Sequence, residues 1–421
     1  MLFRKYAGII GLFLVSAAYG ESDTLRLTLK QADSLFLTRN LSLLAQKYSI
    51  SENEANVIQA KIWDLPNVTI NHNLYNPQSN KYLEFSSASE TMVQLQQLIL
   101  IGGKRSKLVS MARSNVQAAQ YQYQDLCRNL KYQLRSAFYS VYFTSQKLKI
   151  YETEVPLLKQ VVAGYETMYP KGFVSLKDVV RLKALLFSLE NDRLGLIKQL
   201  NNSEDTLRLM LNERAARFVL PVANGQTIDS LSLTKISLNV LLDSASHNRA
   251  DLLYFQAQSA YHKTDLSYQK SLNIPDPSFI VGWDHNGGFV KNYNYVGLNF
   301  DLPAWNKNRG NIRAAEARVE SSKVVYDNYQ LQVNLQVEQA LKRALETEKL
   351  FSTAGAGFGD DFTKIIHAAT DNFLKHQLGL LEFVDLYESY KESQTSLIQL
   401  QSDRIDAIEN LNFTIGKPII N

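Results

Sequence analysis

The residue types that usually carry catalysis or metal binding are few in this chain and widely spaced. No two histidines have the His-Glu-x-x-His spacing that places two zinc ligands on one face of a helix; they are His72, His247, His262, His285, His367 and His376. The single cysteine, Cys127, permits neither an intrachain disulfide nor a cysteine-based zinc site. The sequence also lacks a nucleophile elbow, a Walker phosphate loop and a dinucleotide-binding fingerprint. These absences predict a protein that is not an enzyme and that uses no cofactor and no metal.

Two acidic residues, Glu382 and Asp385, are candidates for an electrostatic role. They are three residues apart in a stretch with helical periodicity, so they share one face of the expected helix. Paired carboxylates on one face can attract cations. Acidic residues near a helix N-terminus are also stabilised by the helix dipole, so a solvated helix start accounts for the same pattern. The spacing alone leaves both interpretations open.

The composition is that of an ordered protein with nearly balanced charge. The 421 residues include 45 Lys+Arg and 41 Asp+Glu, which gives a formal net charge of +4. With 45% hydrophobic and 20% charged residues the chain is not mainly disordered. The small basic excess gives no reason to expect nucleic-acid binding. Only nine prolines interrupt the sequence, which leaves room for very long helices.

The first twenty residues have the pattern of a secretory signal peptide. Arg4 and Lys5 precede a short apolar run, and small residues follow, so cleavage is expected after Ala18 or Gly20. A membrane anchor would need about 20 apolar residues, more than this run provides. No cysteine lies near the cleavage point to take a lipid. The sequence therefore predicts an exported protein that is periplasmic, secreted or placed in an outer membrane as a β-barrel.

The rest of the chain contains an internal duplication. The segment Leu65–Ile70 aligns with Ile274–Phe279, and after a five-residue deletion Leu176–Val180 aligns with Leu380–Val384. The second offset then holds for more than a hundred residues. We therefore expect a signal peptide at 1–20, a first repeat at 21–212, a linker or equatorial segment at 213–233 and a second repeat at 234–421.

Each repeat is predicted to carry two strands with alternating polarity, at about 66–76 and 90–101 in the first copy and 277–286 and 293–303 in the second. Phe279, Val281 and Trp283 share one face, whereas Gln94, Gln96 and Asn299 lie on the polar faces of their strands. Half-buried hairpins of a soluble domain have the same alternation, so the pattern alone does not decide between membrane and water.

Long helices surround these strands in both copies. First helices are expected at Leu29–Trp63 and Ser237–Leu272. A heptad pattern from Val116 to Tyr165 then predicts a long helix that coils with its neighbours. Final helices of the two copies are expected at Ser175–Leu211 and Gly379–Ile415. Pro156 and the glycine-rich run 355–359 fall at nearly the same level of the two long helices, which predicts a shared bend.

The signal peptide and the doubled order of helix, hairpin, long helix and helix resemble the TolC-type outer-membrane efflux proteins. The resemblance covers nearly all of the chain after residue 20. Its most specific part is Gly172–Val179, which resembles the family's helix-tip motif of glycine, aliphatic, valine, small, aliphatic, any residue, aspartate and valine. The second tip, Gly379–Asp385, is looser, because His376 stands where the first copy has Gly172 and Glu382 replaces the aspartate.

The resemblance implies a mainly α fold with a transmembrane β-barrel, built from two tandem repeats. Three identical chains would supply a 12-stranded barrel and an α-helical tunnel across the periplasm. The homotrimer would be an exit channel that works with a periplasmic adaptor (membrane fusion) protein and an inner-membrane pump. The strand count agrees with this, because four strands are too few to close a membrane barrel, which needs about eight.

The resemblance also implies roles for residues at the helix tips. An acidic entrance ring would be formed by Glu382, Asp385 and Asp178. The adaptor would contact Gly172, Phe173, Val174, Ser175, Leu176, Gly379 and Leu380. Leu378 and Phe373 stand where the family often has an arginine and a tyrosine that lock the closed entrance, which favours apolar packing there. The alternative is a periplasmic or secreted coiled-coil structural protein without a pore, and the sequence does not identify an exported substrate.

Overall fold

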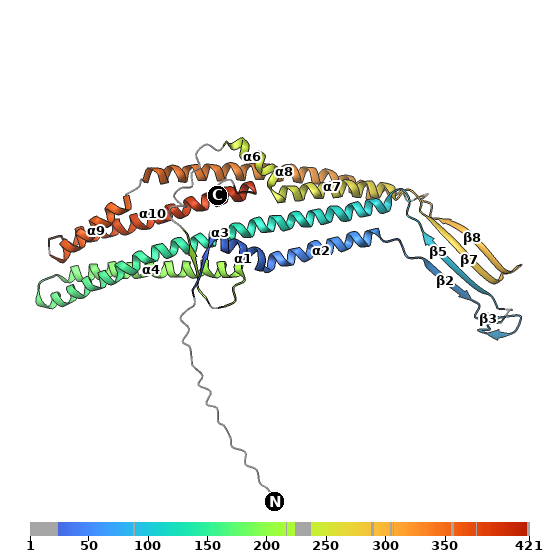
Figure 1. Ribbon diagram of the computed structural model, residues 1–421, viewed down its shortest axis with the longest axis horizontal. Helices are drawn as coiled ribbons and strands as arrows, with labels where there is room; N and C mark the ends of the chain where they lie inside the picture. Colours follow the sequence, from blue (N-terminus) through green and yellow to red (C-terminus); the bar gives the residue numbers. More distant parts are fainter. Residues whose placement is uncertain are drawn as a thin grey trace, which may run out of the picture.

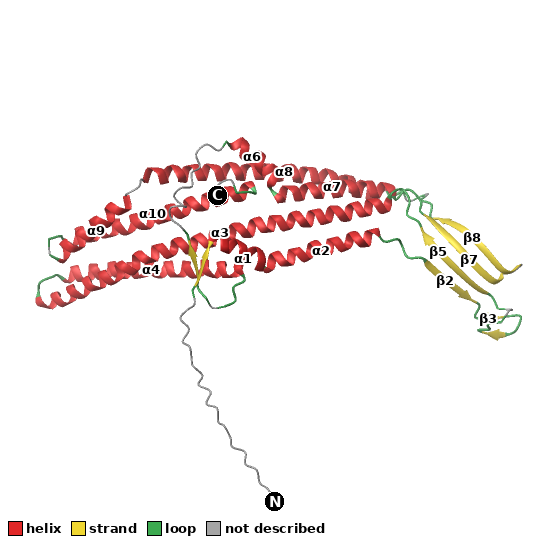
Figure 2. Cartoon of the chain, viewed as in Figure 1, coloured by secondary structure: helices red, strands yellow, loops and turns green. Residues whose placement is uncertain are grey.

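The computed structural model describes residues 24–86, 89–215, 217–223, 237–287, 290–303, 305, 307–354, 358–375 and 377–418. The predicted signal peptide, 1–20, and most of the predicted linker, including 224–233, lie outside these residues. Long helices running along one axis form most of the described chain, and a sheet extends from one of their ends (Figures 1 and 2).

The two halves of the chain have the same order of elements. The first half contains α1 (Leu29–Arg39), α2 (Leu41–Lys61), β2 (Asn67–His72), β5 (Thr91–Leu98), α3 (Lys104–Met168) and α4 (Leu176–Leu211). The second half contains α6 (Leu238–Asn248), α7 (Ala250–Ser271), β7 (Pro277–Gly287), β8 (Val290–Phe300), α8 (Arg309–Ala354), α9 (Phe358–Leu374) and α10 (Leu380–Ile415). The predicted fold class, two tandem repeats of helix, hairpin, long helix and helix, is confirmed.

The first helix of each repeat is divided in two, and the prediction of a continuous helix was wrong. The break falls at Asn40 in the first copy and at the aligned Arg249 in the second, both with extended backbone. The Asn40 side chain accepts hydrogen bonds from the backbone N–H groups of Ser42 and Leu43 and so caps α2. It also donates to the carbonyl oxygen of Met210, 3.0 Å away on α4. A side chain that takes over these backbone bonds ends one helix and starts the next.

The long helix α3 has 65 residues and is therefore about 98 Å long. Its heptad positions are buried from the middle of the helix to near the tip: Leu134, Ala137, Val141, Thr144, Leu148, Tyr151, Val155, Leu158 and Val162. At the start of the predicted seam Gln120 is exposed, whereas Tyr123, Cys127 and Leu130 are partly buried against a core cluster. The repeats differ at the expected bend, because α3 continues through Pro156 whereas α8 and α9 are separate helices on either side of 355–357, which lie outside the described residues.

One antiparallel sheet, in the order β2-β5-β7-β8, joins the two repeats through the pairing of β5 with β7. The strand registers align residues of similar polarity in the central rows of the sheet. One row contains Val68, Leu95, Val281 and Val296, and the next, on the opposite face, contains Thr69, Gln94, Gly282 and Tyr295. Strand β2 ends at His72 rather than at residue 76, and β8 begins at Val290 rather than at residue 293.

Short strands that the sequence patterns did not predict also occur. Strand β1 (Leu25–Thr28) pairs in parallel with β6 (Val219–Val222), which lies in the predicted linker. Strands β3 (Tyr75–Asn76) and β4 (Lys81–Tyr82) pair between β2 and β5. None of the described helices combines the length and the apolar composition that a membrane-crossing helix needs.

Candidate functional site

The first helix tip is a tight reversal whose chemistry fixes the start of α4. A 3₁₀ turn (Tyr169–Lys171) ends at Gly172, whose φ of +76° is readily adopted only by glycine. Ser175 is the N-cap of α4, and its hydroxyl accepts a hydrogen bond from the Asp178 N–H at 3.2 Å. The Asp178 carboxylate accepts in return from the Ser175 hydroxyl at 2.7 Å and from its N–H at 3.3 Å. Asp178 therefore completes a capping box.

The second helix tip leaves its carboxylates without such partners. Gly379 is the N-cap of α10. Its φ of −73° is accessible to any residue, so this position does not require glycine. Leu380 packs against the apolar core at the tip. Glu382 and Asp385 follow in α10 and are exposed, and neither pairs with another side chain among the described residues. These two carboxylates are therefore available to solvent in one chain.

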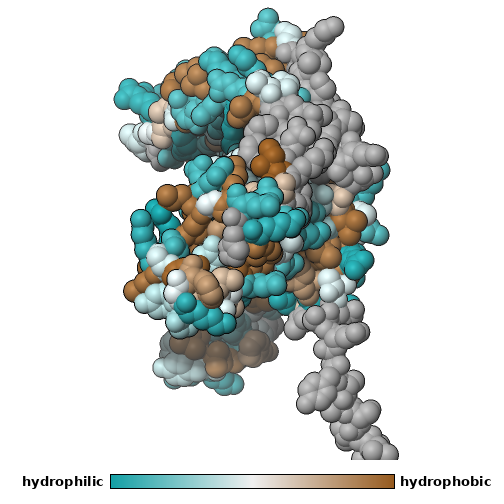
Figure 3. All heavy atoms as spheres, turned by 90° about the vertical axis from the view of Figure 1, so that its left-hand side faces the viewer, coloured by the Kyte–Doolittle hydropathy of each residue, from teal (hydrophilic) through white to brown (hydrophobic). Residues whose placement is uncertain are grey.

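The two tips lie side by side at the end of the molecule opposite the sheet (Figure 1). An open groove of about 650 Å³ runs between them and is lined by Tyr165, Gly172, Phe173, Val174, Ser175, Asp178, Leu378, Gly379, Leu380 and Leu381. Figure 3 looks onto this end and shows apolar residues among hydrophilic ones. Phe173 is 77% exposed, and Leu176 and Leu381 are also exposed. The tertiary structure thus brings most of the predicted tip residues into one surface.

An aromatic stack ties the two tips together. The ring of Tyr165 on α3 stacks on Phe373 of α9 at 5.5 Å between centroids, and Phe373 stacks on Phe383 of α10 at 4.2 Å. Phe373 is fully buried, and Leu378 packs beside the same core. Apolar packing therefore occupies the two positions where the family resemblance gives a polar lock. Such stacking adds to the energy of burial itself.

Two tyrosines next to this stack remain neutral at physiological pH. Burial, and then the charge of Glu154, raise the pKa of Tyr387 far above its ordinary range. Burial raises the pKa of Tyr151 to about 12, with Asp192 adding to the effect. These phenols are therefore packing groups of the tip core rather than acid-base groups.

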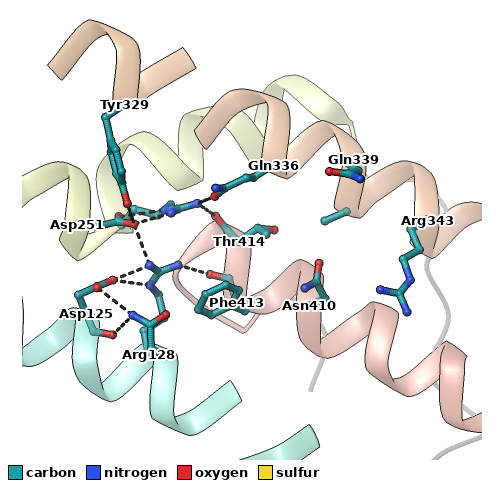
Figure 4. Close-up of a pocket in the computed structure, with 13 residues that line it drawn as sticks. Asp125, Arg128, Asp251, Tyr329, Gln336, Gln339, Arg343, Asn410, Phe413 and Thr414 are labelled. Atoms are coloured by element: carbon teal, nitrogen blue, oxygen red, sulfur yellow. Dashed lines mark hydrogen bonds and ion pairs between the residues drawn. The ribbon is translucent and has the colours of Figure 1, made fainter. Parts of the chain in front are cut away.

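A buried ionic network, which the sequence patterns did not reveal, joins the two repeats (Figure 4). The Asp251 carboxylate on α7 accepts from Arg128 of α3 at 2.8 Å, from Arg249 at 3.0 Å and from the Tyr329 hydroxyl of α8 at 2.8 Å. Arg249 also donates to the Thr414 carbonyl oxygen of α10 at 3.3 Å. A cavity of about 470 Å³ lies beside these groups.

This network repeats a contact of the first half in a charged form. Arg249 aligns with Asn40, and Thr414 aligns with Met210, the residue whose carbonyl accepts from Asn40. The alignment of Asn40 with Arg249 was the one sequence feature that pointed to this site. It could not reveal the ionic network, because the network also needs Arg128 from the other repeat.

The sheet exposes apolar side chains on one face and polar ones on the other. Exposed members of the apolar face include Val68, Ile70, Leu95, Phe279, Val281, Val296 and Leu298. On the polar face the Tyr295 ring lies over Gly282, where a side chain would collide with it, and its hydroxyl donates to Gln94 at 3.1 Å. In this single chain β2 and β8 are both edge strands.

The described residues offer no metal centre. No group of three or more His, Cys, Asp or Glu side chains in this part of the chain is placed to hold a metal ion.

Comparisons with known proteins agree with this architecture. A family model described as outer membrane efflux protein matches residues 33–213. The cobalt-zinc-cadmium resistance protein CzcC of Cupriavidus metallidurans is 20% identical over 351 residues, which cover 79% of this chain and 80% of CzcC.

Solved structures give the same fold at low sequence identity. The Campylobacter jejuni CmeC outer membrane channel has a TM-score of 0.75 and 14% identity, covering 99% of this chain and 93% of CmeC. The open state of the Neisseria gonorrhoeae MtrE outer membrane channel has a TM-score of 0.73 and 14% identity, covering 93% of this chain and 89% of MtrE. Residues 33–213 thus match the outer membrane efflux protein family, and the doubled architecture, paired helix tips and two-faced sheet give the chain the fold of these solved outer membrane channels.

Proposed function

We propose that three copies of this chain form an exit channel in the outer membrane of a Gram-negative cell, with the helices forming a tunnel in the periplasm. The observation that carries the proposal is the four-stranded sheet with one exposed apolar face, one polar face and two free edges. Joining β8 of one chain to β2 of the next removes every edge and gives twelve strands. The apolar face then contacts lipid, and Gln94, Gln96 and Tyr295 line a water-filled lumen.

The helix tips are proposed to contact a periplasmic adaptor protein, which links the channel to an inner-membrane pump. An apolar surface at an exposed helix reversal is typical of a partner-binding surface. The seven residues of this contact are Gly172, Phe173, Val174, Ser175, Leu176, Gly379 and Leu380. Substrate would pass through passively, driven by the pump.

The entrance is proposed to be ringed by acidic side chains. Glu382 and Asp385 are exposed on one helix face, so three chains would place six carboxylates around the opening. Asp178 lies at the same level but is engaged in its capping box, so its part in the ring is secondary. Because CzcC is named for resistance to metal cations, such cations are the first substrate class to test.

The proposed trimeric channel is tested by measuring the mass of the detergent-extracted protein and its ion conductance in a planar bilayer. Protein extracted in detergent is expected to have about three times the chain mass of 47.8 kDa, less any signal peptide, and to conduct ions in a planar bilayer. A water-soluble monomer that conducts nothing would instead support the alternative, a coiled-coil structural protein without a pore.

The acidic ring is tested in the same bilayer by combining Glu382→Gln with Asp385→Asn. We expect a lower preference for cations over anions and weaker block by divalent cations, because the ring loses its negative charge. Asp205→Asn, which changes a carboxylate far from the tips, is the matched control. Unchanged selectivity in the double variant would overturn the ring.

The adaptor contact is tested by Val174→Asp, which places a charge in the apolar tip surface. Export-dependent resistance is expected to disappear while trimers still form, since no core packing is lost. Resistance equal to that of the unaltered protein would contradict this role of the tip.

A further inference from the structure

The loop between β2 and β5, here called the outer loop (described residues 73–86 and 89–90), is a folded unit at the far end of the sheet (Figure 1). Strands β3 and β4 pair within it, and the Leu83 N–H donates to the Leu74 carbonyl oxygen at 2.8 Å. The Tyr75 hydroxyl donates to Asn80 at 2.5 Å. The loop therefore holds its side chains in fixed positions.

Polar side chains point into the outer loop. Asn76 is only 3% exposed, and its side chain donates to the Glu84 carboxylate at 3.2 Å. The Ser79 hydroxyl donates to the same carboxylate, and the Asn76 oxygen accepts from the Gln78 N–H at 2.9 Å. The hydrogen-bonding groups of the loop are thus largely satisfied internally.

Apolar side chains point outward from the same loop. Phe85 is 83% and Tyr82 74% exposed, and Leu74 and Leu83 are exposed as well. Leu83 also has a φ of +47°, a left-handed conformation that is unfavourable for leucine, and its exposed side chain gains no burial in return. Such a group of exposed apolar side chains in one short loop is unusual for a surface that faces only water.

The outward apolar surface of the loop is continuous with the apolar face of the sheet. The Phe85 ring stacks on His72 at 4.3 Å between centroids with an interplanar angle of 9°. His72 lies on β2 on the same face as Val68 and Ile70, because alternate residues of a strand share a face. In the other hairpin the described strands are still paired at Gly287 and Val290.

We propose that the outer loop is a lipid-binding surface that inserts at the boundary between hydrocarbon and headgroups of the outer leaflet. This rests on the proposed function, which makes the adjoining sheet face the lipid contact. Phe85 and Leu83 supply the apolar contact, and Tyr82 supplies an amphipathic ring of the kind enriched at this boundary. The exposed Lys81 beside it suits anionic headgroups.

The proposal is tested by spin labels on single cysteines in a Cys127→Ser background. The labelled variants are Tyr82→Cys and Phe85→Cys, with Ile70→Cys as the reference on the apolar sheet face and Lys171→Cys as the reference in water. Trimers in phosphatidylethanolamine and phosphatidylglycerol vesicles are measured by power saturation with oxygen and a water-soluble nickel complex. Labels at 82 and 85 are expected to favour oxygen over nickel several-fold more than the label at 171.

Each other outcome overturns the proposal in a distinct way. Labels at 82 and 85 that behave like Lys171→Cys would place the loop in water. Labels that neither reagent reaches would mean that a neighbouring copy covers the loop. Both outcomes leave the channel intact if the label at 70 still contacts lipid. A label at 70 that lies in water would overturn the proposed membrane channel as well.

Discussion

At the scale of single residues, the Asp251 carboxylate is held by three side chains, Arg128, Arg249 and Tyr329. Burial acts to raise the pKa of its carboxyl, but hydrogen bonds from Arg249 and Tyr329 and the charges of Arg128 and Arg249 outweigh it, so the pKa lies below its ordinary range. Since the folded pKa is lowered, the carboxylate stabilises the fold fully above its unfolded pKa of about 3.9. That contribution is lost as the pH falls through the lower folded value.

Asp251→Asn is therefore expected to be strongly destabilising at neutral pH. It leaves two arginines facing a neutral amide, and breaking a buried ion pair from one side costs about 3–5 kcal/mol. The thermal midpoint of the detergent-solubilised protein should fall at pH 7, and the difference from the unaltered protein should shrink below about pH 4. Asp243→Asn, an exposed carboxylate near His247, is the control and should change little. Equal midpoints for the two variants would contradict this role.

At the scale of elements, the aromatic stack at the tips helps to hold the two helix pairs α3/α4 and α9/α10 together, within a larger apolar cluster. Phe373 contributes both burial and ring stacking between α3 and α10. Phe373→Ala leaves a cavity in that contact, a change that costs about 3–5 kcal/mol for a buried phenylalanine. We expect larger or more frequent open conductance in planar bilayers, because the tips are less tightly joined.

The matched control for this prediction is Phe187→Ala, which removes the same side chain from α4 where it is 74% exposed. It should leave the conductance unchanged. If Phe373→Ala conducts like Phe187→Ala while its trimer remains folded, the stack does not govern the opening.

At the scale of the whole molecule, the two faces of the sheet predict opposite responses to the same substitution at neighbouring positions. Leu95 lies in the middle of β5 on the apolar face, and Gln96 lies next to it on the polar face. Leu95→Arg would place a charge in lipid, which costs about 2–4 kcal/mol near the bilayer midplane. Gln96→Arg would place the same charge in the aqueous lumen.

Leu95→Arg should therefore lower the amount of trimer assembled in the outer membrane, measured by membrane fractionation. Gln96→Arg should assemble normally and shift the bilayer selectivity toward anions. Equal assembly of the two variants would mean that the apolar face does not contact lipid, and it would count against the channel itself.

Regular periodicity made much of this fold predictable. The strand alternation and the heptad pattern between Leu134 and Val162 are local, and the duplication and the order of elements follow from comparing the sequence with itself. None of these features requires knowing which elements come into contact. The capping box at Ser175 and Asp178 is local in the same sense. The role of the tip residues in binding or selectivity stays a prediction.

The remaining features depend on side chains that are distant in sequence, and only the tertiary structure decided them. Asn40 ends a helix partly because it meets a carbonyl 170 residues away, and Asp251 is held by an arginine 123 residues away. The outer loop differs, because the bonds to its glutamate come from residues five and eight positions away, but they follow no period that a sequence pattern could reveal. The sequence by itself determined the repeated helices and strands, because their polar and apolar residues alternate with helical or strand periodicity along the chain. The junctions, the tip groove and the loop were decided by which of those elements came into contact.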